Sequence, residues 1–167
     1  MTYVLGGWQS DFADNWTRKG WDTATAFAET VGSGLAAVDL EPKDIESGHV
    51  GNFAGELFAG QGLMGGFFGM LHGDFNGMPT ARHEAACASG SVAILAAAAE
   101  IDAGRYDLSC VVGFEQMRNV SGEQAARISA APHGRATNIS TRRSRGRRPF
   151  PISPTNTRSA TASTIAT

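Results

Sequence analysis

The sequence of 167 residues has few cysteines, no long apolar run and, in its last quarter, no acidic residue. Cys87 and Cys110 are the only two cysteines. They provide no disulfide framework, which excludes the small, disulfide-stapled secreted domains and fits a reducing compartment. No apolar stretch reaches the roughly 18 residues of a membrane-spanning helix, and the N-terminus lacks the basic and apolar segments of a signal peptide. We therefore expect a cytoplasmic protein without a membrane span.

Acidic residues are absent after Glu123. Residues 1–126 hold sixteen acidic and six basic residues, a net charge of −10, whereas residues 127–167 hold eight basic residues and a net charge of +8. The second segment also lacks Leu, Val, Met, Trp and Tyr, so it cannot bury enough apolar surface to offset its chain entropy. We predict a domain at 1–126 and a disordered basic tail at 127–167. Specific nucleic-acid binding is not expected, because the arginines are not accompanied by a folded platform of aromatic side chains on which bases could stack.

An alanine-rich stretch after Cys87 predicts a helix from Ala88 to Ala103. It contains no proline and one glycine, and Gly104 is well placed to end it in a left-handed conformation. The side chains of this helix are small and apolar on most of its sides, which favours a position inside a protein. Cys87 would then lie at the helix N-terminus, where free amides and the helix dipole stabilise a thiolate. Cys87 is thus the candidate catalytic nucleophile.

Two motifs around this helix resemble those of the thiolases, the acetyl-CoA acetyltransferases and 3-ketoacyl-CoA thiolases. Cys87-Ala-Ser-Gly followed by Val-Ala-Ile resembles their nucleophile segment, and Val112-Gly-Phe-Glu-Gln-Met resembles their downstream strand motif. The resemblance covers about Tyr3 to Ala126, the N-terminal portion of such an enzyme. The context of His83 and Glu84 leans towards the sterol-carrier-protein type of thiolase.

The chain alternates strand and helix patterns. The strands are predicted at residues 3–6, 49–53, 80–86 and 108–114; the helices are predicted at 21–38, in the glycine-rich stretch 55–73, and at 88–103. Such alternation predicts an α/β fold with a parallel-dominated sheet and helices on both faces. In a thiolase this is most of the N-terminal half of a duplicated fold.

The resemblance implies that Cys87 attacks the carbonyl of a 3-ketoacyl-CoA, expels acetyl-CoA and passes the acyl group to a second coenzyme A. Coenzyme A thioesters are then substrates, and no further cofactor or metal is expected. The family's remaining acid/base groups come from C-terminal motifs that this sequence lacks, and His49, His72, His83 and His133 lie in other contexts. The chain by itself is expected to be inactive or severely impaired.

Other residues have less direct roles. Glu115 is expected to order the loops around the site, by the resemblance, and Cys110 is expected to be structural. Gly51-Asn52 resembles the Gly-Asn pair that thiolases carry at the end of a core strand, although a simple strand terminus would also explain it. The resemblance places Arg82, His83 and Glu84 at the interface of a homodimer or of a thiolase-like heteromer.

Three alternatives remain for the chain. It is an incomplete thiolase-type acyltransferase, a noncatalytic thiolase-like partner subunit, or a relative of the ketoacyl synthases. A shift of the reading frame near Ala126 would explain the tail in the first case. With GC-rich codons for Ile152 to Thr157, reading one base earlier gives Asp-Leu-Ala-Asp-Glu-Tyr, which restores the acidic and apolar residues that the tail lacks.

Overall fold

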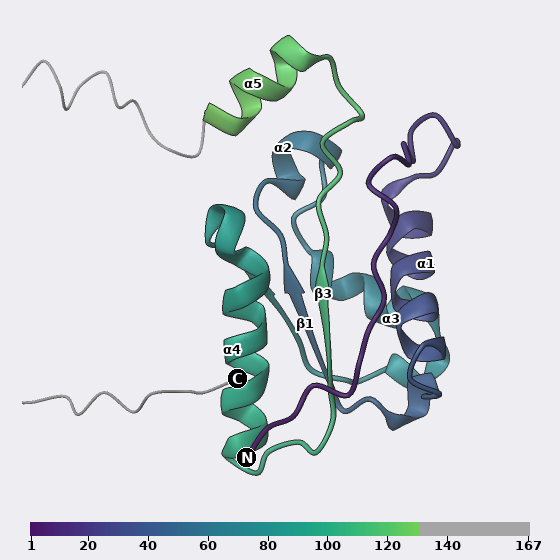
Figure 1. The fold of residues 1–167 in the computed structure, drawn as a ribbon, viewed down its shortest axis with the longest axis vertical. Coiled ribbons are helices and arrows are strands. Elements are labelled where there is room, and N and C mark those ends of the chain that lie inside the picture. Colours follow the sequence, from purple (N-terminus) through teal and green to yellow (C-terminus); the bar gives the residue numbers. More distant parts are fainter. Residues whose placement is uncertain (131–167) are drawn as a thin grey trace, which may run out of the picture. The chain divides into compact units, whose positions relative to one another are not determined.

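Three short segments of the chain form a parallel sheet. The computed structural model describes residues 1–130 and contains strands β1 (Ser47–Gly51), β2 (Thr80–His83) and β3 (Ser109–Gly113). Their order is β2-β1-β3, and both pairings are parallel. Helices lie on both faces of this sheet, as Figure 1 shows. The predicted α/β class with a parallel-dominated sheet is therefore confirmed.

The three strands differ in burial. β1 is central and buried along its whole length. β3 was expected to be buried on both faces, but within residues 1–130 it lies at an edge of the sheet and most of it is only half-buried. Its apolar run indicated a strand correctly; the edge position explains the partial exposure.

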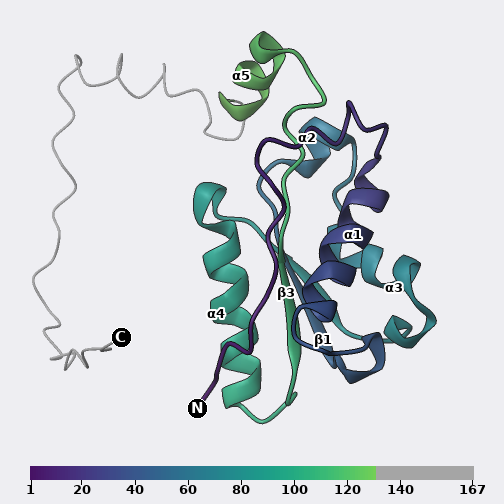
Figure 2. The ribbon, with the colours of Figure 1, turned by 45° about the vertical axis from the view of Figure 1, so that its right-hand side comes forward.

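Helix α1 (Thr23–Ala36) covers one face of the sheet. It begins at Asp22, whose side chain accepts a hydrogen bond of 2.8 Å from the amide of Thr25, as an N-cap residue does. Its stripe of apolar side chains centres on the fully buried Phe27, which contacts the rings of Phe67, Phe68 and Phe114. Helix α3 (Phe67–Leu71) lies beside it, as Figure 2 shows. The aromatic cluster between these helices and the sheet is the main core.

The glycine-rich segment is not one helix. It forms α2 (Gly55–Ala59), a 3-10 turn (Met64–Gly66) and α3. Gly60 has a φ of 65°, a left-handed conformation that ends α2 after five residues. The prediction of a single helix over this segment was wrong because its glycines terminate helices as readily as they allow close packing.

Helix α4 (Ser89–Asp102) covers the other face of the sheet. Gly104 follows the C-cap residue Ala103, as predicted, and its φ is 69°, a left-handed conformation. The amides of Gly104 and Arg105 donate to the carbonyls of Ile101 and Glu100 at 2.9 and 3.0 Å, which is the Schellman pattern. Among the described residues only one side of α4 is buried, through Ser89, Ala93 and Ala97. Val92, Ile94 and Leu95 are 37%, 52% and 69% exposed, so the expected interior position holds for one face alone.

Two histidines and a glutamate form a polar cluster under α4. His49 of β1 is 3% exposed; its Nδ1 lies 2.9 Å from Nε2 of His83, and its Nε2 lies 3.1 Å from a carboxylate oxygen of Glu100. The two rings are stacked with centroids 5.1 Å apart. Burial and, to a lesser extent, His49 lower the pKa of His83, while Glu100 opposes them. The cluster therefore favours a neutral His83.

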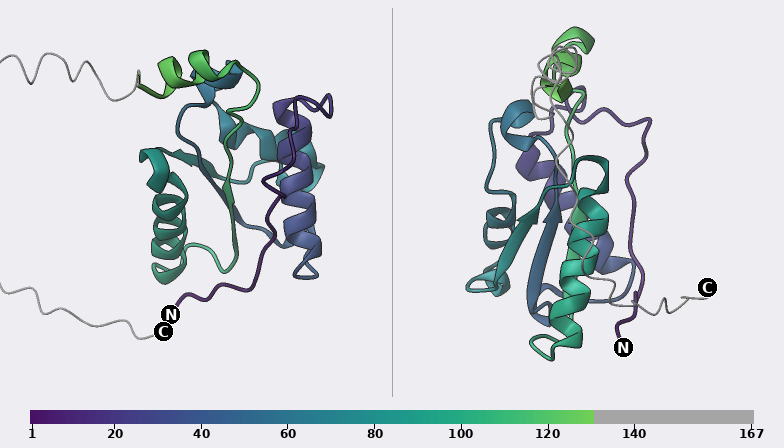
Figure 3. Two further views of the ribbon diagram at one scale, coloured as in Figure 1. Left: turned by 45° about the horizontal axis from the view of Figure 1, so that its top comes forward. Right: turned by 90° about the vertical axis from the view of Figure 1, so that its left-hand side faces the viewer.

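The chain departs from the sequence predictions at its two ends. Residues 3–6 form no strand, and Tyr3, Val4 and Leu5 are 65–86% exposed. No strand among the described residues lies beside them to form backbone hydrogen bonds. Thr2 instead donates a 2.8 Å hydrogen bond to Asp102, which holds the N-terminus at the end of α4 (Figure 3). Helix α5 (Gly122–Ala130) was not predicted, and its last turn includes the first residues of the expected tail.

The predicted disorder concerns mainly residues 131–167, which lie outside the described residues. Among residues 1–130, no helix has the length and apolarity needed to cross a lipid bilayer. The same residues contain no group of three or more His, Cys, Asp or Glu side chains suited to holding a metal ion.

Replacing His83 tests the electrostatics of the cluster. Because the pKa of His83 is lower in the folded protein than its usual 6.5, the unfolded chain binds more protons near that pH. The contribution of His83 to the free energy of unfolding should be fully present above about pH 6.5 and should decrease as the pH falls below that value. We expect His83→Gln to flatten this loss between pH 7.5 and 5.5, as measured by urea unfolding. His72→Asn, at a half-exposed position, is the control and should leave the slope unchanged; an equal effect of both variants would contradict the assignment.

Candidate functional site

A cavity of about 680 Å³ lies where the carboxyl ends of β1 and β3 meet the start of α4. Ligands of open parallel sheets bind at this end of the strands. The cavity is lined by four segments, namely the loop 10–17, the end of β1, the start of α4 and the stretch after β3; Ser129 of α5 completes it. From these segments its lining includes Phe12, Trp16, Gly51, Phe53, Cys87, Gly90, Glu115 and Arg118.

Cys87 lies on the wall of this cavity and is exposed. β2 ends four residues earlier, and Cys87 stands in a 3-10 turn, Ala86–Ala88, that leads directly into α4. The helix thus starts two residues later than Cys87, and the free amides of its first turn lie next in sequence. The sequence prediction placed Cys87 beside the N-terminus of a long helix, and the structure has that arrangement.

Gly51 lets α4 approach the end of β1. A Cβ atom on Gly51 would lie 2.6 Å from both the backbone nitrogen and the Cα of Gly90, and 2.7 Å from the carbonyl carbon of Ser89. Real Cβ atoms do not come this close to backbone atoms, so any side chain would push the helix away. The absence of a side chain on Gly51 therefore allows the first turn of α4, next to Cys87, to lie against the end of β1.

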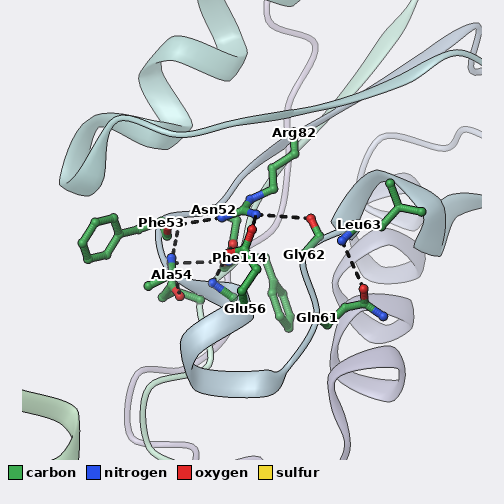
Figure 4. A network of polar contacts seen from close by, with 11 residues as sticks. Asn52, Phe53, Ala54, Glu56, Gln61, Gly62, Leu63, Arg82 and Phe114 are labelled. Carbon is green, nitrogen blue, oxygen red and sulfur yellow. Dashed lines mark hydrogen bonds and ion pairs between the residues drawn. The ribbon is translucent and has the colours of Figure 1, made fainter. Parts of the chain in front are cut away.

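Asn52 joins the ends of all three strands. It is 1% exposed, and its backbone amide donates to the carbonyl of His83 at 3.1 Å. Its side-chain nitrogen donates to the carbonyl of Phe114 at 2.8 Å, and its side-chain oxygen accepts from the amide of Gly55 at 3.0 Å (Figure 4). The side-chain amide of Asn52 thus satisfies backbone groups after β3 and at the start of α2, while its backbone amide binds the last residue of β2. The Gly-Asn pair is more than a strand terminus.

Glu115 orders the loop after β1, as the resemblance implied. Its carboxylate accepts hydrogen bonds from the amide of Phe53 at 2.7 Å and from the amide of Ala54 at 3.4 Å. Burial raises the pKa of Glu115, while these hydrogen bonds lower it. The carboxyl group lies on the cavity wall and holds the adjoining loop in place.

Arg82 fixes the same loop from the other side. Its guanidinium pairs with Glu56 and donates to the carbonyls of Gly62 and Phe53, each at 3.2 Å, as Figure 4 shows. Arg82 lowers the pKa of Glu56 through this hydrogen bond. The expected interface role of Arg82 and its neighbours stays a prediction; within the chain, Arg82 and His83 are engaged as described.

The loop 10–17 forms the wall that the sequence analysis did not identify. Trp16 stacks on Phe114 with centroids 5.2 Å apart and an interplanar angle of 14°. Arg118 donates to the backbone carbonyls of Phe12 and Asp14 at 3.2 and 3.3 Å. The sequence contains these residues but no local pattern that pairs segments about a hundred positions apart.

Cys110 lies away from the cavity lining, in β3, and packs against the core. Burial raises the pKa of its thiol to about 11, so it is protonated at neutral pH. This agrees with a structural role. His49, His72 and His83 also lie outside the cavity lining, and His133 lies outside the described residues.

Comparisons with known proteins agree on one family. The family model of the thiolase N-terminal domain matches residues 18–144. The acetyl-CoA acetyltransferase of Methanocaldococcus jannaschii is 32% identical over 128 residues, which are 77% of this chain and 32% of that protein. That of Methanothermobacter thermautotrophicus is 29% identical over 120 residues, 70% of this chain and 30% of that protein. The chain thus spans about a third of the length of these curated relatives.

Replacing Gly51 should disturb Cys87 specifically. We expect Gly51→Ala to lower the free energy of unfolding by about 1–3 kcal/mol through overpacking and to slow alkylation of Cys87 by iodoacetamide severalfold. The reason is that the displaced first turn of α4 carries the adjoining Cys87 away from its position on the cavity wall.

Gly48→Ala is the matched control on the same strand. Its Cβ would lie 2.7 Å from the Phe68 ring, on the opposite face of the sheet. It should also cost stability, but it should leave the alkylation rate of Cys87 unchanged. Equal rates in both variants would show that Gly51 does not position Cys87.

Proposed function

The chain belongs to the thiolase family, and from this premise we propose that Cys87 is the nucleophile of an acyl transfer between coenzyme A thioesters. The observation that carries the proposal is the position of Cys87, exposed on the wall of a 680 Å³ cavity at the carboxyl ends of the strands. The curated relatives, which are named acetyl-CoA acetyltransferases, support this class of reaction.

In the proposed half-reaction, the thiolate of Cys87 attacks the carbonyl carbon of an acyl-CoA. A sulfur–carbon bond forms to Cys87, the carbon–sulfur bond to coenzyme A breaks, and the leaving thiolate takes up the proton that Cys87 gave up. In a complete thiolase a second coenzyme A thiol would reverse these steps and carry the acyl group away. Cys110 is an unsuitable nucleophile because burial keeps its thiol protonated.

Complete turnover requires an acid/base group and oxyanion donors for each thioester. The sequence lacks the C-terminal motifs that supply them in thiolases, and the chain spans about a third of its relatives. We therefore propose that this chain accepts an acyl group but does not turn over. The family match favours a thiolase over the ketoacyl synthase alternative, and the sterol-carrier-protein type stays a prediction.

Acylation of Cys87 tests the proposal directly. After incubation with acetyl-CoA, intact-protein and peptide mass spectrometry should show one acetyl group, on Cys87, with release of one equivalent of coenzyme A. Cys87→Ala should abolish the adduct, whereas Cys110→Ala should retain it. An adduct on Cys110 alone would contradict the assignment of the nucleophile. Absence of any adduct, together with a stable complex with a thiolase-like protein, would support the noncatalytic partner subunit instead.

The coding DNA tests the origin of the basic segment. If the frame shifts near Ala126, another frame downstream should encode acidic and apolar sequence and reach the thiolase Cys-x-Gly and Gly-His-Pro motifs. Resequencing codons 115–135 and translating the three forward frames gives the answer. The family match continues to residue 144, 18 residues beyond the expected boundary, so the search should extend at least that far. If the reading frame is confirmed and no other frame encodes such motifs, the basic segment is a real part of the protein.

A further inference from the structure

The turn that carries Cys87 has an unfavourable backbone conformation. Ala86, the residue before Cys87, has a φ of 50°, in the left-handed region that residues with a Cβ atom rarely adopt. Apart from Ala86, Asp39 is the only non-glycine residue among the described residues with a positive φ. Because such a conformation persists only where the surroundings hold it, the structure must contain the groups that hold Ala86.

Ser89 holds this turn from inside the fold. Its side chain is 4% exposed and makes two hydrogen bonds to the turn, both within four residues of it in sequence. The hydroxyl oxygen accepts from the amide of Ala85 at 2.9 Å, and the hydroxyl donates to the carbonyl of Ala86 at 2.7 Å. The carboxylate of Glu84 also accepts from the amide of Ala86, at 3.2 Å, but Glu84 is exposed to water. Ser89 therefore provides the buried contacts on both sides of Ala86.

We propose that Ser89 is a positioning residue for Cys87. Its hydroxyl fixes the left-handed conformation of Ala86, and this conformation directs the chain from β2 into the 3-10 turn that places Cys87 on the cavity wall. The role of Ser89 deepens the proposed function and rests on it only for the acyl-transfer measurement described below. The geometry of the turn is testable without it.

Amide hydrogen exchange measures whether the turn persists. The amide of Ala88 donates to the carbonyl of Ala85 at 2.9 Å, and the amide of residue 89 donates to the carbonyl of Ala86, so both report on the closed turn. Ser89→Ala should speed exchange at these two amides by about tenfold. Ser91→Ala, at an exposed position of the same helix, is the matched control and should change neither rate.

Ala86→Gly separates positioning from packing. Glycine adopts the left-handed conformation without a steric penalty, so Ala86→Gly combined with Ser89→Ala should restore most of the protection at residues 88 and 89. The single variant Ala86→Gly should exchange more slowly than the wild type. If Ser89→Ala unfolds the protein or opens the turn and Ala86→Gly does not reverse this, Ser89 only fills space in the core and the proposal is overturned.

Acylation by acetyl-CoA provides the functional readout. The rate of acetyl transfer to Cys87 should fall about tenfold in Ser89→Ala and recover in the double variant. If the wild type is not acylated at all, the proposed function fails while the exchange data still decide the role of Ser89. If acylation is unchanged in Ser89→Ala although the turn opens, the positioning role is refuted and the proposed function stands.

Discussion

The close contact between β1 and α4 at Gly51 and Gly90 is the constraint on which the site depends. The first turn of α4 can lie this near the end of β1 only because Gly51 carries no side chain, whereas a Cβ on Gly90 would meet open space. The contact determines how far the first turn of α4 projects past the strand ends. Cys87 directly precedes that turn, so the position of Cys87 on the cavity wall depends on the missing Cβ of Gly51. The other segments that line the cavity lie around this turn.

The polar groups near the strand ends serve the same arrangement. Loops that line a cavity carry backbone amides and carbonyls that need partners. Asn52 and Glu115 supply them from the inner side, and Arg82 supplies them from β2. Most of the hydrogen bonds of these three side chains go to backbone, although Asn52 also donates to the carboxylate of Glu115 at 3.4 Å. Replacing one of them should therefore free a loop while the strands keep their backbone pairing. The wall formed by residues 10–17 is fixed differently, by the stacking of Trp16 and by Arg118.

Local sequence patterns predicted the elements whose cause is local. The period of Phe27, Val31 and Leu35 indicated α1, and Gly104 marked the end of α4 through a left-handed turn. The sequence after Cys87 indicated that this cysteine stands directly before a long helix, as it does in the structure. The patterns failed where distant segments decide the outcome. Tyr3 to Gly6 have strand composition but no partner among the described residues, and the glycines after Gly55 break a helix that their apolar neighbours suggested. Nothing local pairs Arg118 with residues 12–14.

The hydrogen bonds that Ser89 makes to the turn before α4 span at most four residues, and those inside α4 are similarly local. Closing such small loops costs little chain entropy, and contacts of this range form early in folding. The hydrogen bonds of the turn and of its helix therefore need no distant segment, whereas the contact of Gly90 with Gly51 requires the sheet. The local bonds set the shape of the turn, and the sheet sets where Cys87 lies.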